Sequence, residues 1–256
     1  MEDRTLAAET LAFAMRTFAG FQANATVIEG EGLLTVAGTS RFPTPYSNAA
    51  LPLGGDSPER VLDLARARLA DRRHFLWAPA GAAGAGLARA AGYVPVGEVP
   101  ALVLDAPPAP RESALRVEVL HEAEGLGAFL GVAAAAYAEA GLPARILPTL
   151  FARAARVVEE SRVAVAWDGE EPIATALALL DPTTVQAGIY WVGTAPHARR
   201  RGAADAVTRR VARDAFERGA RAVVLEASAA GEPVYRAMGF RDLARWERLL
   251  SPPPGE

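Results

Sequence analysis

The segment VGTAPHARRRGAA, which starts at Val192, has the residue types and spacing of a phosphate-binding turn. We predict a strand up to Thr194 and a helix from about Ala203, so the turn between them presents several backbone N–H groups to one point. The helix dipole adds positive potential there, and anions bind at such helix N-termini. Small residues leave the main chain accessible, and basic residues flank it: Gly202, Ala203 and Ala204, with Arg199, Arg200 and Arg201. An ordinary helix start in an arginine-rich protein is the alternative.

A second segment, SAAGEPVYRAMGF, begins at Ser228 and ends at Phe240. Tyr235 lies on a short predicted helix, seven residues after Ser228 and 31 residues after Ala204. A tyrosine hydroxyl can donate a proton to a leaving group, which makes Tyr235 a candidate general acid. The alternative is a half-buried aromatic residue that only packs on its helix.

Together the two segments resemble the GNAT (Gcn5-related N-acetyltransferase) family. Its pyrophosphate loop is written Gln/Arg-x-x-Gly-x-Gly/Ala, and Arg199-x-x-Gly202-x-Ala204 fits that pattern. The segment from Ser228 to Phe240 is similar to its closing motif, a small polar residue followed by a Tyr and a Gly-Phe pair. The resemblance implies the acyl-CoA N-acyltransferase fold, an α/β fold with a mixed sheet and flanking helices.

The resemblance covers about residues 115–250 and implies an N-acetyltransferase that moves an acetyl group from acetyl-CoA to a primary amine. The backbone of Val192 and Thr194 would pair with the pantetheine arm, and an N–H there would polarise the thioester. Tyr235 would protonate the leaving thiolate. Ser228 would help to hold the cofactor, although many relatives have the longer Asn there. The resemblance implies acetyl-CoA, or another acyl-CoA, as co-substrate and no metal.

The general base and the acceptor are left open. Gln186 and Tyr190 could orient a water that removes the proton, and Asp181 or Glu226 could act instead. Residues 138–143 look like the lip of an acceptor pocket, with Glu139 as the one acid there. A single carboxylate does not distinguish a small amine from a lysine or a protein N-terminus.

A proline-rich stretch at residues 106–110 divides the chain, because three prolines in five residues fit neither a helix nor a central strand. We predict a domain at 1–106, a linker at 107–113, a catalytic domain at 114–250 and a frayed tail at 251–256. Patterning in the second part predicts helices at 122–140, 147–160, 203–218 and 234–238, and strands at 162–167, 173–180, 185–194, 222–225 and 243–250.

An internal repeat with an offset of 147 residues relates the two parts. Gly92-Tyr93 corresponds to Gly239-Phe240, and further pairs share this offset: Gly55 and Gly202, Leu64 and Val211, Leu69 and Phe216, Leu76 and Val223. Arg199 corresponds to Pro52 and Tyr235 to Ala88, so we predict a degenerate, inactive first copy. Three polar and aromatic residues in that copy could line a substrate cleft or only pack locally: Tyr46, Asn48 and Trp77.

The amino-acid composition bears on the kinds of site and partner that the protein can have. The chain has no Cys and three His, which excludes disulfides and makes a metal centre improbable. Its net charge of −3 does not favour a nucleic-acid or membrane-surface partner. No signal peptide or long apolar stretch is evident, so we expect a cytoplasmic protein, with a homodimer as an open option.

Two other functions compete with the enzyme. A non-catalytic acyl-CoA sensor or interaction protein would keep the turn but not need Tyr235. A nucleotide-phosphate enzyme would need the Gly-x-x-x-x-Gly-Lys-Ser/Thr loop, which the sequence lacks.

Overall fold

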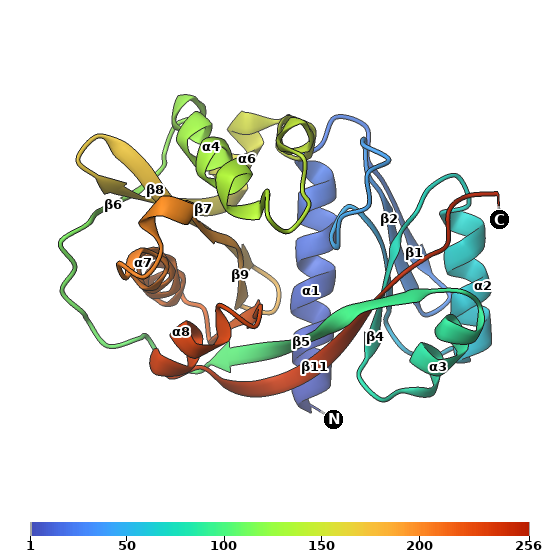
Figure 1. Ribbon diagram of the computed structural model, residues 1–256. Helices are drawn as coiled ribbons and strands as arrows, with labels where there is room; N and C mark the ends of the chain where they lie inside the picture. The colour runs from blue at the N-terminus through green and yellow to red at the C-terminus, as the bar shows by residue number, and fades with distance from the viewer. Residues whose placement is uncertain (1, 256) are drawn as a thin grey trace. The chain divides into compact units, whose positions relative to one another are not determined.

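The computed structural model describes residues 2–255, which form two compact units. Unit 1 holds the described residues up to Ala101 together with those from Leu243 onward, and unit 2 is Leu102–Asp242. Two strands, β5 (Val94–Leu104) and β11 (Arg241–Leu250), carry the chain from one unit into the other (Figure 1). The last strand of the chain therefore belongs mostly to the unit formed by the first hundred residues.

Unit 1 is a mixed sheet with helices on both faces. Its strands follow the order β1-β2-β3-β4-β11, in which only β3 and β4 are parallel. Its other elements are α1 (Glu2–Gly20), β1 (Thr26–Gly30), β2 (Leu33–Ala37), β3 (Asn48–Pro52), α2 (Pro58–Arg68), β4 (Phe75–Pro79) and α3 (Ala83–Ala90).

Helix α1 buries one face, on which Leu11, Met15 and Phe18 recur at helical spacing. Helices α2 and α3 pack with the sheet in a separate core that includes Leu62, Ala88 and the β11 residue Leu249. The sheet is thus covered on both sides.

Unit 2 has the strand order β10-β9-β8-β7-β6, antiparallel except for the β9–β10 pair. Helix α4 packs on β8 and β9 from one side and α7 from the other (Figure 1). Its elements are β6 (Arg116–Val119), α4 (Leu126–Tyr137), α5 (Leu147–Leu150), α6 (Ala154–Glu160), β7 (Ser161–Asp168), β8 (Glu171–Asp181), β9 (Gln186–Thr194), α7 (Ala203–Glu217), β10 (Ala222–Glu226) and α8 (Glu232–Ala237), with short 3₁₀ turns at Ala123–Gly125, Ala144–Ile146 and Pro196–Ala198.

The predicted strands and the α7 helix are confirmed to within a few residues, and one predicted helix was wrong. The helix expected at 147–160 is two short helices, because Phe151 and Arg153 leave helical backbone geometry between them. The Phe151 ring packs edge-on against Phe129 and Trp191 instead of continuing a helix face.

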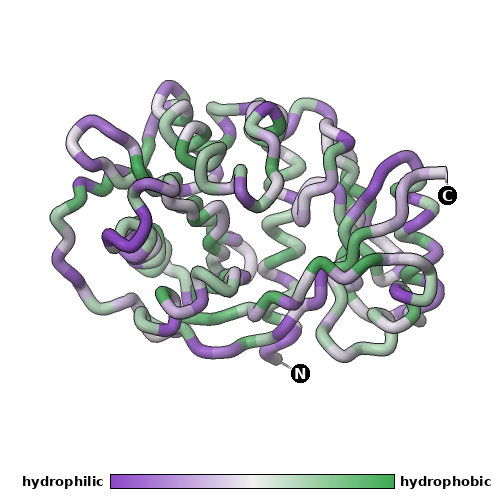
Figure 2. The backbone as a smooth tube through the Cα atoms, in the orientation of Figure 1, coloured by the Kyte–Doolittle hydropathy of each residue, from purple (hydrophilic) through white to green (hydrophobic). Residues whose placement is uncertain are grey.

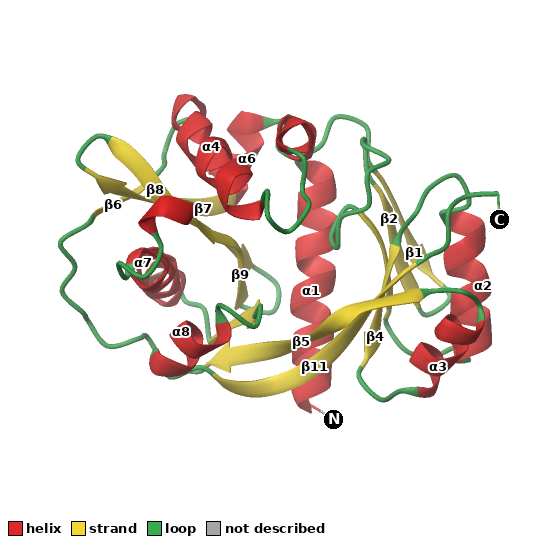
Figure 3. Ribbon diagram, in the orientation of Figure 1, coloured by secondary structure: helices red, strands yellow, loops and turns green. Residues whose placement is uncertain are grey.

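The internal repeat is visible in the element bounds. Adding 147 to the bounds of β4 gives those of β10, and the same offset takes the start of β5 to the start of β11. Each half of the chain also has the series antiparallel strand pair, parallel strand, short helix, strand: β2, β3, β4, α3 and β5 in the first half, and β8, β9, β10, α8 and β11 in the second (Figure 3). The two units are therefore copies of one fold.

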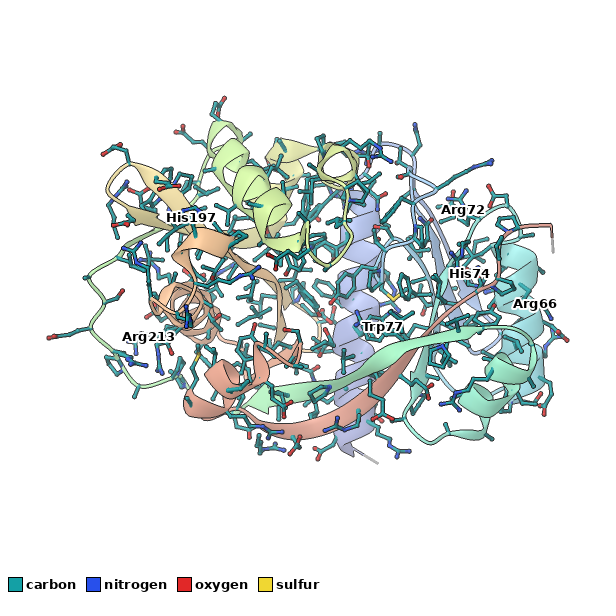
Figure 4. All side chains as sticks on the ribbon, viewed as in Figure 1. Arg66, Arg72, His74, Trp77, His197 and Arg213 are labelled. Atoms are coloured by element: carbon teal, nitrogen blue, oxygen red, sulfur yellow. The ribbon has the colours of Figure 1, made fainter. Side chains whose placement is uncertain are left out.

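The proline-rich stretch lies along α7 within unit 2. Arg209 donates to the Ala109 carbonyl at 2.8 Å and Arg213, labelled on α7 in Figure 4, donates to the Pro108 carbonyl at 3.2 Å. Arginines of α7 thus hold the extended segment through hydrogen bonds to its carbonyls. The boundaries at 106, 113 and 250 stay predictions, since compactness divides the chain at Ala101 and Asp242 instead.

The polar and aromatic residues singled out in the first copy have local roles. The Asn48 amide donates to the carbonyls of Ser40 and Phe42 and its oxygen accepts from the Gly38 N–H. The Trp77 indole donates to the Pro45 carbonyl, and the Tyr46 ring packs beside it. These contacts favour the local-packing alternative.

The β5 strand is apolar along most of its sequence, as its green trace in Figure 2 shows. Its last six residues are buried, whereas Val94 and Val96 are exposed. Among residues 2–255, no helix combines the length and apolar character needed to cross a membrane.

The buried His74 should make unit 1 sensitive to acid. Its ring bonds the Tyr93 hydroxyl at 2.8 Å, and burial, with Arg66 nearby (Figure 4), lowers its pKa from about 6.5 to about 4. Between these values the unfolded chain binds the proton and the folded chain does not, so stability falls as pH drops from 6.5 toward 4. We expect His74 to account for a loss of about 3 kcal/mol over that window.

Denaturant unfolding of the wild type and of His74→Gln between pH 7.5 and 4.5 measures this effect. The wild type should lose more stability than the variant over this pH window, because the remaining titratable groups are the same in both proteins. Parallel stability curves would contradict a buried neutral His74.

Candidate active site

The β9 strand has a bulge in the middle of the predicted binding segment. Its pairing with β8 shifts register so that the step from Tyr190 to Gly193 faces a shorter step from Leu177 to Thr175. Trp191 within the bulge has a positive φ of 55°, which costs a non-glycine residue of order 1–3 kcal/mol. Such bulges redirect backbone groups away from the sheet ladder. The bulge therefore lies in the backbone segment around Val192, whose N–H the sequence analysis expects to polarise the thioester.

The other edge of β9 is open over the same stretch. Within the described residues, β10 pairs with β9 at 222–224 against 186–188 and not beyond. From Ile189 onward the two strands separate, so the main chain of Val192 and Thr194 has an edge to which an extended ligand can bond. Both residues are half-buried on β9, as the pantetheine assignment requires.

The turn from β9 into α7 has the geometry of an anion site. Gly202 precedes the helix with φ 77°, and a Cβ built there would meet no atom within 4 Å. Arg200 is also left-handed, at φ 64°. The first N–H groups of α7, from Ala203 and Ala204 onward, have no hydrogen-bond partner within the helix. No side chain at Gly202 blocks the approach of an anion to them.

Two of the three arginines at this turn already have carboxylate partners. Arg199 bonds Glu139 at 2.8 Å and Arg201 bonds Asp168 at 2.7 Å, both at exposed positions. Exposed ion pairs contribute about 0–1 kcal/mol, so these contacts could exchange for phosphate contacts at little cost. The acid expected at the acceptor lip, Glu139, is thus linked to the predicted phosphate side.

Tyr235 is buried on α8, and its ring packs edge-on against Phe240 at 5.9 Å. Burial raises its pKa well above the usual value near 10. The hydroxyl therefore stays protonated across the neutral range, which a general acid requires.

Ser228 shapes the turn that carries Tyr235. Its hydroxyl and its carbonyl both accept from the Gly231 N–H, and the carbonyl also accepts from Glu232. A Cβ at Gly231 would lie 2.9 Å from the Tyr235 ring and 3.3 Å from the Ser228 hydroxyl. Ser228 has a structural role here, and its contact with a cofactor stays a prediction.

Tyr137 is a site residue that the sequence analysis missed. It ends α4, and its hydroxyl donates to the Val192 carbonyl at 2.9 Å. Its half-buried side chain has a raised pKa, first through desolvation of the phenol and second through the Tyr235 phenol. A tyrosine just before the expected lip carries no motif, so no sequence signal could have found it.

The proposed water-orienting groups fall into two sets. Gln186 pairs with Asp181 at the far end of β9, six residues before Val192 and so about 20 Å away along the strand. Tyr190 lies two residues from Val192, but its hydroxyl lies beside Gly188, where an added Cβ would clash with it, and so points toward the far end of β9. Glu226 ends β10 where the strands have separated. Position therefore favours Glu226 over Gln186, Asp181 and Tyr190.

Trp191 contributes a buried donor to this region. Its indole Nε1 is buried without an acceptor among the described residues, and its ring contacts Tyr137 at 5.4 Å and Phe151 at 5.3 Å. Within residues 2–255, no cluster of three or more His, Cys, Asp or Glu could hold a metal ion.

Comparison with known proteins places this site in a family domain. Residues 122–242 match the family model described as an acetyltransferase (GNAT) domain, which includes the bulge, the turn and Tyr235. No curated protein matches the sequence.

Solved structures resemble the chain over nearly its full length. A GCN5-related N-acetyltransferase from Kribbella flavida has a TM-score of 0.72 at 17% identity, over 97% of this chain and 95% of that one. One from Sphaerobacter thermophilus has a TM-score of 0.63 at 16% identity, over 96% and 91%. A functionally unknown conserved protein from Staphylococcus epidermidis has a TM-score of 0.63 at 11% identity, and the match covers 90% of this chain and 95% of that one. At these identities the likeness is one of fold, and it extends over both units.

Substitution at Gly202 should separate ligand binding from folding. Gly202→Glu puts bulk and negative charge where a phosphate would meet the α7 N–H groups, so we expect at least a 100-fold loss of CoA affinity. Isothermal calorimetry on the full chain measures it.

Gly219→Glu is the matched control. Gly219 follows α7 at φ 95°, and a Cβ there also meets no atom within 4 Å, so the backbone strain is similar. This variant should bind CoA normally. Equal binding by both variants would place the pyrophosphate elsewhere.

Proposed function

Because residues 122–242 of this chain form an acetyltransferase domain of the GNAT family, we propose that the protein transfers an acetyl group from acetyl-CoA to a primary amine. The observation that carries this proposal is the meeting of three features in unit 2: the bulged β9, the open N-terminus of α7 and the buried Tyr235. The fold over the whole chain is that of the GNAT acyl-CoA N-acyltransferases, in two copies.

The residues fit acetyl-CoA as a substrate. The space above Gly202 admits the pyrophosphate, with Arg199, Arg200 and Arg201 at its rim, and the open edge of β9 offers Val192 and Thr194 to the pantetheine amides. Strand-like pairing fixes the arm along β9, and this orientation brings the thioester to the bulge.

The reaction is a direct displacement. The neutral amine nitrogen attacks the thioester carbonyl carbon, and the Val192 N–H stabilises the negative charge that develops on oxygen. The carbon–sulfur bond then breaks as the Tyr235 hydroxyl gives its proton to sulfur. Water takes the proton from the new amide nitrogen and returns one to Tyr235 through solvent.

Unit 1 has the same order of strands and helices but lacks the counterparts of the arginines and Tyr235. Pro52, which the 147-residue offset pairs with Arg199, ends β3 as Thr194 ends β9, and the five residues between it and α2 include no arginine. The buried Ala88 of α3 stands at the position of Tyr235. We propose that unit 1 binds no CoA. Dividing the chain at the linker would remove β11 from its partner β4, so this idea is tested on the full chain, where one CoA per chain is expected.

The role of Tyr235 is tested by Tyr235→Phe, which keeps the ring and its packing. CoA affinity should change by less than about fivefold, since one neutral hydrogen bond contributes about 1 kcal/mol. The chemical step should slow by roughly 10²- to 10⁴-fold. Single-turnover kinetics with acetyl-CoA and an amine found in a broad screen measure it.

Tyr93→Phe is the control, because it removes another buried tyrosine hydroxyl, in unit 1. It should leave turnover unchanged. Equal losses of binding and turnover in Tyr235→Phe would make the hydroxyl a binding group. CoA binding without turnover by the wild type would favour the acyl-CoA sensor.

The pH profile gives a separate prediction. The raised pKa of Tyr235 keeps it protonated above pH 10, so loss of the acid should not lower the rate at alkaline pH. The rate should instead rise with pH as the acceptor amine loses its proton, and then level off. A fall in kcat between pH 8 and 10 in stable protein would contradict Tyr235 as a buried acid.

A further inference from the structure

Tyr137 contacts three consecutive residues of the β9 bulge. Its ring packs edge-on against Trp191 at 5.4 Å, and its hydroxyl donates to the Val192 carbonyl at 2.9 Å. At Gly193 the strand comes so close to α4 that an added Cβ would lie 2.8 Å from the Ala136 Cβ and 3.4 Å from the Tyr137 ring. The end of α4 thus holds the bulge through a ring, a hydrogen bond and a close backbone approach.

We infer that Tyr137 is a positioning residue: its hydrogen bond fixes the Val192–Gly193 peptide and, through it, the course of the bulge that sets the direction of the neighbouring Val192 N–H toward the thioester carbonyl. This inference rests on the proposed acetyl transfer. A regular strand would fix this backbone by its ladder, but the bulge breaks the ladder on the β8 side and β10 has already separated on the other. The hydrogen bond from Tyr137 replaces the lost constraint.

The strained backbone needs such a partner. Trp191 holds a left-handed φ that a large aromatic residue adopts only when its surroundings impose it. Without the Tyr137 bond, rotation about the Trp191–Val192 segment could return the strand toward ordinary geometry. The Val192 N–H would then turn away from the carbonyl oxygen.

Tyr137 is suited to hold the backbone in place and not to transfer a proton. A hydroxyl has one proton, and Tyr137 donates it to Val192. Burial keeps the phenol neutral, so it is a constant donor and a poor base.

The central experiment is Tyr137→Phe in the full-length protein, read by the polarisation of bound acetyl-CoA. In the wild type, the ¹³C=O stretch of [1-¹³C]acetyl-CoA should move to lower frequency on binding, because an N–H polarises the carbonyl. In the variant this shift should shrink. Turnover should fall about 10- to 100-fold, less than the 10²- to 10³-fold loss of a whole oxyanion donor. CoA affinity should stay within about threefold.

Tyr93→Phe again controls for the loss of one buried tyrosine hydrogen bond, and should change neither the carbonyl frequency nor turnover. Amide hydrogen exchange without ligand gives a readout that does not need the reaction. The amides of Val192 and Gly193 should exchange faster in Tyr137→Phe and not in Tyr93→Phe.

The double variant Tyr137→Phe/Tyr235→Phe separates positioning from a proton path. Independent roles predict that the two losses in turnover multiply. A double variant no slower than Tyr235→Phe would make Tyr137 part of the proton path and overturn the inference. Unchanged turnover, carbonyl frequency and exchange in Tyr137→Phe would overturn it as well.

Failure of the proposed function looks different. A wild type that shows neither acetyl-CoA binding nor turnover would refute acetyl transfer, while the exchange rates would still decide whether Tyr137 holds the bulge. A wild type that turns over, with an unaltered Tyr137→Phe, would refute only the positioning role.

Discussion

The chemistry of unit 2 depends on a strand that loses its regular pairing on both edges at one place. On one edge β10 stops pairing with β9 at Gly188, and on the other a bulge at Trp191 breaks the ladder with β8. In a complete sheet each backbone N–H and C=O is used by a neighbouring strand. Here the groups around Val192 lack ladder partners, the Val192 carbonyl accepts from Tyr137 instead, and Trp191 has a strained backbone.

Three helices contribute to the proposed site in different ways. The α4 end contacts the bulge through Tyr137, α7 begins after a linker of eight residues from β9, and α8 carries the buried Tyr235. None of them contributes a charged side chain to the reacting centre as proposed. Electrostatic support comes from backbone dipoles and neutral hydroxyls, which need no reorganisation when charge develops.

The first copy shows which parts of the fold are framework. It keeps the strand and helix order and the parallel β3–β4 pair, but only five residues link β3 to α2, where eight link β9 to α7. Its core and its buried Asn48 network are complete, so unit 1 is stable packing without the catalytic groups. Strand β11 follows α8 of unit 2 but pairs with β4 of unit 1, so the end of the second copy completes the sheet of the first.

The sequence by itself determined the local features: the turn before α7, the motif around Tyr235, the strand and helix order of unit 2 and the 147-residue repeat. These follow from spacing along the chain, where periodicity, glycine positions and helix starts are direct consequences of residue type. It did not show the break at Phe151, the bulge at Trp191, the carboxylate partners of Arg199 and Arg201, or the unit that receives β11. Each of these depends on residues that are distant in the sequence, such as Tyr137 with Val192 and Trp77 with Arg248 across β4 and β11. Only the tertiary structure brings them together, because long-range packing and strand pairing are decided by the whole fold.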